Sequence, residues 1–122
     1  MAKDISHILS ALLGQRANSG RSTWSPAVDV YQLSQGWLIK FDLAGVKPTD
    51  IEVRVGGRRL TVRGRRRDWI VQEVCTAYSM EISYDQFERI LELPCSLDEA
   101  DIQTEYREGM LLVRLSLKGS GA

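Results

Sequence analysis

From Trp24 onward, apolar residues alternate with polar ones in short runs along most of the chain. Because successive side chains of a strand point to opposite faces, each run predicts a strand with one buried face. Turn-forming segments such as Gly56-Gly57 and Arg107-Glu108-Gly109 separate the runs. Several short strands at this spacing predict an all-β sandwich or barrel. The apolar members of the clearest runs are Val28 and Val30; Trp37, Ile39 and Phe41; Ile51, Val53 and Val55; Leu60 and Val62; and Leu111, Val113, Leu115 and Leu117.

The pattern of core strands is interrupted between Gly64 and Phe87. A structureless connection of about twenty residues is uncommon inside a compact domain, so this segment needs structure of its own. Its apolar or larger residues alternate with small or polar ones, which predicts a β-rich excursion; they are Val74, Thr76, Tyr78, Met80, Ile82 and Tyr84. The alternation changes phase at Asp85-Gln86, which predicts a bulge or turn there.

The first 22 residues follow a different period. Ile5, Ile8, Leu9, Leu12 and Leu13 have the spacing that places apolar groups on one stripe of a helix. Gly14 is a suitable helix stop, and residues 15–23 are polar and rich in turn formers. We therefore expect a short amphipathic helix and a flexible segment over residues 1–22, ahead of a domain over residues 23–118.

Length and composition fit one cytoplasmic domain. The chain has 122 residues and a net charge of zero, so no global attraction to nucleic acid or to a membrane follows. Its start carries Asp4 and an apolar stretch broken by polar residues, unlike a secretory signal, and no stretch approaches a membrane span. Cys75 and Cys95 are then expected to be reduced thiols.

The residue types needed for catalysis or metal binding are sparse. The single histidine, His7, lies in the expected terminal helix, away from cysteines and acid clusters. No spacing of Cys and His suits a metal, no nucleophile has a credible partner, and the glycines lack the context of a phosphate-binding loop. We expect no enzyme, no cofactor and no metal site.

An arginine-rich segment leaves a second function class open. Residues 54–67 contain seven arginines and no acid, and residues 81–108 contain nine acids. Arginines beside Trp69 could contact phosphates and stack on bases, as in a nucleic-acid-binding β-domain. Alternatively, they are the outward residues of strands and pair with the acidic second half. The neutral chain favours this second interpretation and a protein that binds no nucleic acid.

Four motifs occur in an order that is typical of one family. They are the Trp-Ser-Pro-Ala-Val-Asp run at residues 24–29, Leu-Ala-Gly-Val at residues 43–46, Phe-x-Arg at residues 87–89 followed by Leu93-Pro94, and Gly-x-Leu at residues 109–111. From residue 24 to 118 the chain resembles the α-crystallin domain of small heat-shock proteins. The chain departs from the family pattern at Asp85, where the family has a glycine. The resemblance implies an immunoglobulin-like sandwich of about seven to nine antiparallel strands.

The resemblance also implies how copies of the chain would associate. In the bacterial and plant type of dimer, the excursion over residues 65–86 carries a strand that pairs with the partner's strand near residues 24–31. The implied homodimer interface comprises Trp24, Val28, Val30, Val74, Tyr78, Met80 and Arg89. An edge groove is expected at Val53, Val55, Leu111 and Val113. The short tail at residues 119–122 lacks the family's Ile-x-Ile motif, so we expect dimers or small assemblies.

The function implied by the resemblance is that of an ATP-independent chaperone of the stress response, a holdase that binds partly unfolded client proteins. Candidate client-binding residues are those of the terminal stripe, Ile5, Ile8, Leu9, Leu12 and Leu13, together with the edge groove. An equal alternative for the stripe is packing on its own domain or on other subunits in an assembly. Two alternatives remain open: an arginine-rich nucleic-acid binder, and a structural adaptor that uses the sandwich only for dimerisation.

Overall fold

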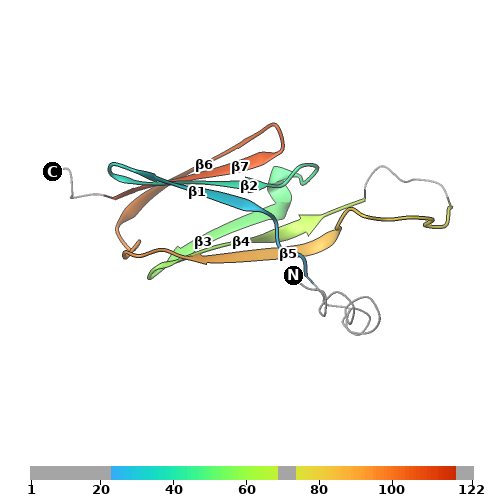
Figure 1. The fold of residues 1–122 in the computed structure, drawn as a ribbon, viewed down its shortest axis with the longest axis horizontal. Coiled ribbons are helices and arrows are strands. Elements are labelled where there is room, and N and C mark those ends of the chain that lie inside the picture. The colour runs from blue at the N-terminus through green and yellow to red at the C-terminus, as the bar shows by residue number, and fades with distance from the viewer. Residues whose placement is uncertain (1–22, 69–73, 118–122) are drawn as a thin grey trace.

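The chain forms two stacked antiparallel sheets in the computed structural model, which describes residues 23–68 and 74–117 (Figure 1). The described residues form seven strands: β1 (Val28–Leu33), β2 (Gly36–Asp42), β3 (Ile51–Gly56), β4 (Arg59–Arg66), β5 (Asp85–Glu92), β6 (Ala100–Arg107) and β7 (Met110–Leu117). One short 3-10 helix, η2 (Pro48–Asp50), precedes β3. The all-β sandwich predicted from the sequence is confirmed. The helix expected at residues 5–13 lies outside the described residues.

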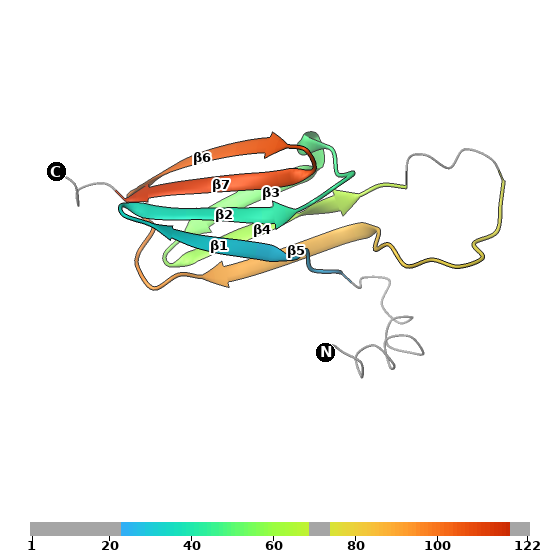
Figure 2. The same cartoon turned by 45° about the horizontal axis from the view of Figure 1, so that its top comes forward.

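The sheets have the orders β1-β2-β7-β6 and β3-β4-β5. Figure 2 shows β1 and β5 as the edges on one side of the sandwich, and β6 and β3 as the edges on the other. Hairpins join β1 to β2, β3 to β4 and β6 to β7. The predicted β3–β4 turn lies one residue later than expected: Gly56 ends β3 and pairs with Arg59, and the turn residues are Gly57, in the left-handed region at φ 62°, and Arg58. The outer edge of β5 is already paired with Trp24 beside Phe87, so β1, β3 and β6 offer the more open edges to which a second chain could add a strand.

The core is built from the alternating runs seen in the sequence. Ile39, Phe41 and Val113 point inward from the first sheet, and Leu60 and Val62 from the second, all fully buried. Residues outside the strands close the ends of the sandwich; they are Leu43, Val46, Leu93 and Leu97. Backbone hydrogen bonds fix these closures, among them Leu97 N to Gly57 O at 2.7 Å and Leu43 N to Gly109 O at 2.8 Å.

The change of phase predicted at Asp85-Gln86 coincides with an unusual backbone conformation. Asp85, the first residue of β5, has φ 72°, in the left-handed region that residues other than glycine rarely adopt. Asp and Asn tolerate this region better than other side chains. At Asp85, where the resembled pattern has a glycine, the chain thus carries a residue type that tolerates this conformation.

The β6–β7 turn contains a residue that is poorly suited to its conformation. Glu108 has φ 50° and Gly109 has φ 81°, which is the pattern of a two-residue type I′ turn. Asn-Gly is the preferred sequence for this turn, so we expect Glu108→Asn to raise the free energy of unfolding by about 0.5–1 kcal/mol. Urea unfolding measures this change. The control is Glu99→Asn, which makes the same substitution in a turn whose φ is not positive; an equal gain in both variants would contradict the explanation.

Candidate interaction surfaces

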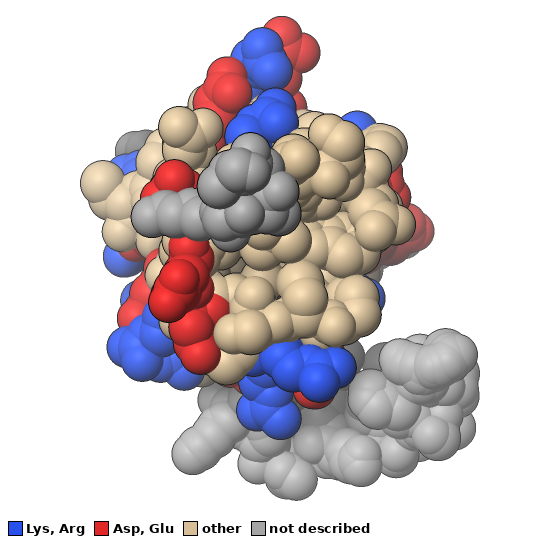
Figure 3. All heavy atoms as spheres, turned by 90° about the vertical axis from the view of Figure 1, so that its left-hand side faces the viewer, with Lys and Arg blue, Asp and Glu red and all other residues tan. Residues whose placement is uncertain are grey.

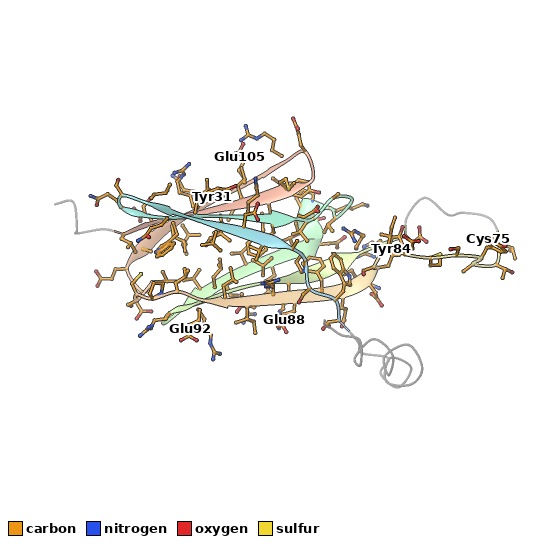
Figure 4. All side chains as sticks on the ribbon, in the orientation of Figure 1. Tyr31, Cys75, Tyr84, Glu88, Glu92 and Glu105 are labelled. Atoms are coloured by element: carbon orange, nitrogen blue, oxygen red, sulfur yellow. The ribbon has the colours of Figure 1, made fainter. Side chains whose placement is uncertain are left out.

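The outer face of the three-stranded sheet carries most of the arginine-rich segment, and its charges are paired. Glu52 on β3 accepts hydrogen bonds from Arg54 Nε at 2.7 Å and from Arg63 Nε at 3.1 Å. Arg63 also lies 3.8 Å from Glu88 on β5, and Arg65 Nε lies 3.2 Å from Asp85 Oδ1. Figure 4 shows Glu88 and Glu92 pointing away from the core on this side. The predicted pairing of outward arginines with the acidic second half is confirmed for Arg63 and Arg65, whereas Arg54 pairs with Glu52 on its own strand.

Two carboxylates, those of Glu52 and Asp50, have pKa values lowered by hydrogen bonds from arginines of this segment. Hydrogen bonds from Arg54 and then Arg63 hold the pKa of Glu52 below its ordinary 4.5. Asp50 accepts two hydrogen bonds from Arg67, at 2.9 and 3.0 Å, which hold the pKa of Asp50 below its ordinary 3.8. Figure 3 likewise shows basic and acidic side chains side by side, around a broad uncharged area at one end of the sandwich.

The lowered pKa of Glu52 predicts a dependence of stability on pH. Because the folded pKa lies below the unfolded one, the stabilisation is fully present above pH 4.5 and is lost as the pH falls through the folded pKa. We expect Glu52→Gln to lower the urea midpoint at pH 7, and to make that midpoint fall less steeply between about pH 5 and pH 3 than in the wild type. The comparison variant Glu99→Gln makes the same charge change away from this face; if its acid limb flattened equally, the assignment to Glu52 would be wrong.

The described part of the excursion between β4 and β5, residues 74–84, extends away from both sheets (Figures 1 and 4). Residues 74–84 form no strand within the described chain, so the β structure predicted there is not made by a single copy. Val74 and Tyr78 are fully exposed, at 104% and 100%, and Met80 and Ile82 are also exposed. Cys75 is exposed near the far end of the excursion, and Cys95 is a half-buried free thiol next to the core. Residues 74–82 therefore form an extended segment whose apolar side chains pack on no other part of the described structure.

The edge strand β1 is the second part of the predicted dimer interface. Among the described residues, β1 pairs with β2 alone, which leaves its other backbone edge open. Val28 is half-buried against the core, and Val30 is 43% exposed. An open edge with exposed apolar side chains is a site at which another strand can add.

Trp24 and Arg89, also predicted at the dimer interface, make contacts within their own chain. The Trp24 ring packs on Phe87, with centroids 5.1 Å apart, and Trp24 N donates to Gln86 O at 3.1 Å. Arg89 lies opposite the buried Val62 in the register of β4 and β5, so it points inward from an edge strand. Its Nη1 donates to Pro26 O at 3.1 Å. Both residues hold the segment leading into β1 against β5.

The four residues predicted to line an edge groove do not lie together at an edge. Val53 and Val55 are half-buried on the edge strand β3, as expected. Leu111 and Val113 lie on β7, an interior strand, and are 5% and 0% exposed, so the prediction that they line an accessible groove is wrong. The edge on the side of β3 is β6, where Ile102 is 43% exposed. Ile102 is the residue that the sequence reasoning missed, since its alternation signal does not say that β6 is outermost.

Three further predictions concern the terminal stripe, metal sites and membrane spans. The candidate client-binding residues Ile5, Ile8, Leu9, Leu12 and Leu13 lie outside the described residues. Within residues 23–68 and 74–117, no group of His, Cys, Asp and Glu is arranged to hold a metal ion. In the same part of the chain, no helix has the length and apolar character needed to cross a membrane.

Comparison with known proteins assigns this arrangement of strands to a family. The model of the Hsp20/alpha crystallin family matches residues 29–121. Spore protein SP21 of Stigmatella aurantiaca is 31% identical over 96 residues, which cover 79% of this chain and 57% of that protein. Small heat shock protein C2 of Rickettsia felis is 22% identical over 96 residues, 79% of this chain and 62% of that protein. The chain thus spans about six tenths of the length of these two relatives.

Solved structures share the fold over a similar range. The structure of hspA from Xanthomonas axonopodis has a TM-score of 0.66 and 30% identity, covering 80% of this chain and 97% of that chain. A small heat-shock protein from Xylella fastidiosa has a TM-score of 0.66 and 26% identity, covering 81% and 91%. The family match and the shared two-sheet fold agree over the same residues, and the chain therefore belongs to the Hsp20/alpha crystallin family, that of the small heat-shock proteins.

Proposed function

We propose that the protein is an ATP-independent holdase that binds partly unfolded proteins and prevents their aggregation, acting as a homodimer formed by strand exchange. Family membership supports a chaperone role, and members of the family are generally not enzymes. The observation that carries the proposal is the excursion, whose Val74 and Tyr78 are fully exposed in the single chain. Exposed apolar surface of this kind indicates an interaction site.

Strand exchange would give the excursion and the β1 edge the partners that each lacks. In an extended segment Val74, Tyr78 and Met80 share one face, and β1 offers an open row of backbone N–H and C=O groups. Adding the excursion to this edge would satisfy those groups and pack the apolar face against the partner's Val28 and Val30. A two-fold arrangement uses both edges reciprocally.

Trp24 and Arg89 would contribute to the dimer from within their own chain. The hydrogen bond from Arg89 to Pro26 and the packing of Trp24 on Phe87 fix the segment that leads into β1. A fixed edge loses less conformational entropy when a second strand adds to it. We assign these two residues to the support of the interface rather than to contact across it.

Client proteins would be held by apolar surface that folding leaves exposed. We propose the terminal stripe of Ile5, Ile8, Leu9, Leu12 and Leu13 as one surface, and the edges β3 and β6 as another, through Val53, Val55 and Ile102. Binding unfolded forms lowers their free concentration, and aggregation slows by mass action without any bond chemistry. The proposed compartment is the cytoplasm, where Cys75 and Cys95 would remain reduced thiols.

Light scattering from a heated client protein, recorded without ATP, tests the proposed function. We expect substoichiometric to equimolar amounts of the protein to suppress scattering, and a truncation lacking residues 1–22 to suppress it less while staying folded. Unchanged scattering would contradict the holdase. Full activity of the truncation would remove the terminal stripe as the main client surface. Steeply salt-dependent binding of an oligonucleotide, with no effect on scattering, would support the nucleic-acid alternative instead.

A further inference from the structure

The base of the excursion is held by a cluster of side chains that the dimer proposal does not by itself require. Arg66, the last residue of β4, faces Asp85, the first residue of β5, in the register of the sheet. The Nε of Arg66 donates to Ala44 O at 3.0 Å, and its Nη1 donates to Ser83 O at 2.8 Å. The Arg66 guanidinium carbon also lies 4.4 Å from the centroid of the Trp24 ring. The half-buried Arg66 thus connects the end of β4, the segment that returns to β5, and Trp24 in the segment that leads into β1.

Trp24, on whose ring the Arg66 guanidinium lies, is itself held by several contacts. Its backbone N donates to Gln86 O at 3.1 Å, its backbone O accepts from Glu88 N at 3.0 Å, and its Nε1 donates to Asp85 O at 3.2 Å. The ring packs on the buried Phe87. Trp24 is therefore a rigid support against β5, and the cation–π contact places the Arg66 guanidinium on it.

Neighbouring contacts hold the two ends of the excursion in the same region. Arg65 pairs with Asp85, whose φ of 72° turns the chain as it enters β5. Arg67 holds Asp50 with two hydrogen bonds on the outgoing side. Beyond this base, the exposed excursion has no such ties among its described residues: Tyr84 lies at the base, and Cys75 lies far from it (Figure 4).

We infer that Arg66 is a positioning residue for strand exchange: by holding Ser83 O and the Trp24 ring at once, it fixes the direction in which the excursion leaves the sandwich. This inference rests on the proposed homodimer. If the excursion could leave the sandwich in many directions, docking on a partner would cost the conformational entropy of that freedom. Fixing its base in advance removes part of this cost and strengthens association without adding a contact to the interface.

The chemistry of the cluster requires a guanidinium. Its planar fork can donate to two carbonyls in different directions and still present a flat face to an indole ring. A lysine keeps the charge, but its ammonium is a point donor on a flexible stem and cannot reproduce both functions. Arg66→Lys therefore separates positioning from charge.

The test compares Arg66→Lys with Arg58→Lys in the full chain. Arg58 also donates from Nε to a backbone carbonyl, Leu93 O at 3.3 Å, but it lies in the β3–β4 turn at the opposite end of the same sheet. The dimer dissociation constant is measured by sedimentation, the exchange of isotope-labelled subunits by native mass spectrometry, and domain stability by urea unfolding. We expect Arg66→Lys to weaken the dimer about tenfold and to speed subunit exchange. Arg58→Lys should leave both near the wild-type values.

A second variant tests the aromatic side of the cluster, and the urea midpoint of each variant shows any general loss of stability. Trp24→Phe keeps an aromatic ring under Arg66 and against Phe87 but removes the hydrogen bond to Asp85 O. We expect it to lower the urea midpoint slightly, through the lost hydrogen bond, and to weaken the dimer about threefold. A dimer that is insensitive to Arg66→Lys overturns the positioning role alone. A wild-type chain that stays monomeric at high concentration overturns the proposed dimer and this role with it.

Discussion

Replacing Gly64 by alanine is expected to lower the free energy of unfolding by about 3 kcal/mol, because the site has no room for a methyl group. A Cβ at this position would clash with the backbone oxygen of Asp50 and would lie 2.8 Å from Phe87 Cζ. Asp50 leads directly into β3, whose Ile51 pairs with Gly64, so the backbone can move away only by disturbing the β3–β4 ladder. The Phe87 ring is buried and supports Trp24, so it cannot move freely either.

Gly56→Ala is the matched control for this substitution. Gly56 ends the neighbouring strand β3, and a Cβ built there meets no atom within 4 Å. We expect its free energy of unfolding to change by no more than about 0.5 kcal/mol, with a small gain if the unfolded chain loses freedom. Urea unfolding of both variants under the same conditions measures the difference. Equal urea midpoints for the two variants would show that β3 and β4 make room for the methyl group at position 64 without a loss of stability, which would contradict the prediction.

Local patterns in the sequence were sufficient to predict most of the strands and the face that each one buries. Ile39 and Phe41, like Val113 and Leu115, stand two residues apart and are all buried, because side-chain direction in a strand depends only on the pleat. The existence of the β3–β4 turn, though not its exact position at Gly57-Arg58, and the irregularity at Asp85 are also local, since each reflects a positive φ angle.

The order of strands within the sheets could not be obtained in the same way. Leu111 and Val113 have the alternation of a half-buried strand, which is the same for an edge and an interior strand, and β7 in fact lies between β2 and β6, where both residues are buried. Ile102 has a weaker pattern but lies on the outermost strand. Which strands are neighbours is decided by packing between segments that are distant in sequence, and periodicity carries no information about it.

The excursion shows a related limit. The alternation of Val74, Tyr78 and Met80 predicted a strand, and the described chain forms none there. Periodicity reports that a segment suits a pleated, half-buried surface, and it does not say whether that surface belongs to the same molecule. The contact between Arg66 and Trp24 is equally invisible in sequence, because it depends on β4, β5 and the segment before β1 meeting at one point.

Removing the excursion is expected to convert the protein into a folded monomer. Arg66 and Asp85 face each other in register, so an Asn-Gly pair in place of residues 67–84 would close β4 and β5 as a tight hairpin. The core lies entirely outside the deleted segment, so the β-sheet circular dichroism should persist. Association should weaken by roughly 100-fold or more, because the proposed interface loses one of its two strands. Sedimentation over a wide concentration range measures this loss.

Substitutions within the excursion separate its side chains from its length. Val74→Ser, Tyr78→Ser and Met80→Ser together remove the exposed apolar face and retain the backbone, and we expect them to weaken the dimer almost as much as the deletion does. Cys75→Ser with Ala77→Ser changes the opposite face of the same segment and should leave the dimer nearly intact. Client aggregation is then measured with the deletion variant, the triple serine variant and the Cys75→Ser/Ala77→Ser control. The comparison decides whether the excursion acts only in dimerisation. If the monomer formed by deletion still suppresses scattering, clients are held by the sandwich or the terminal segment, and the dimer is not required for holding them.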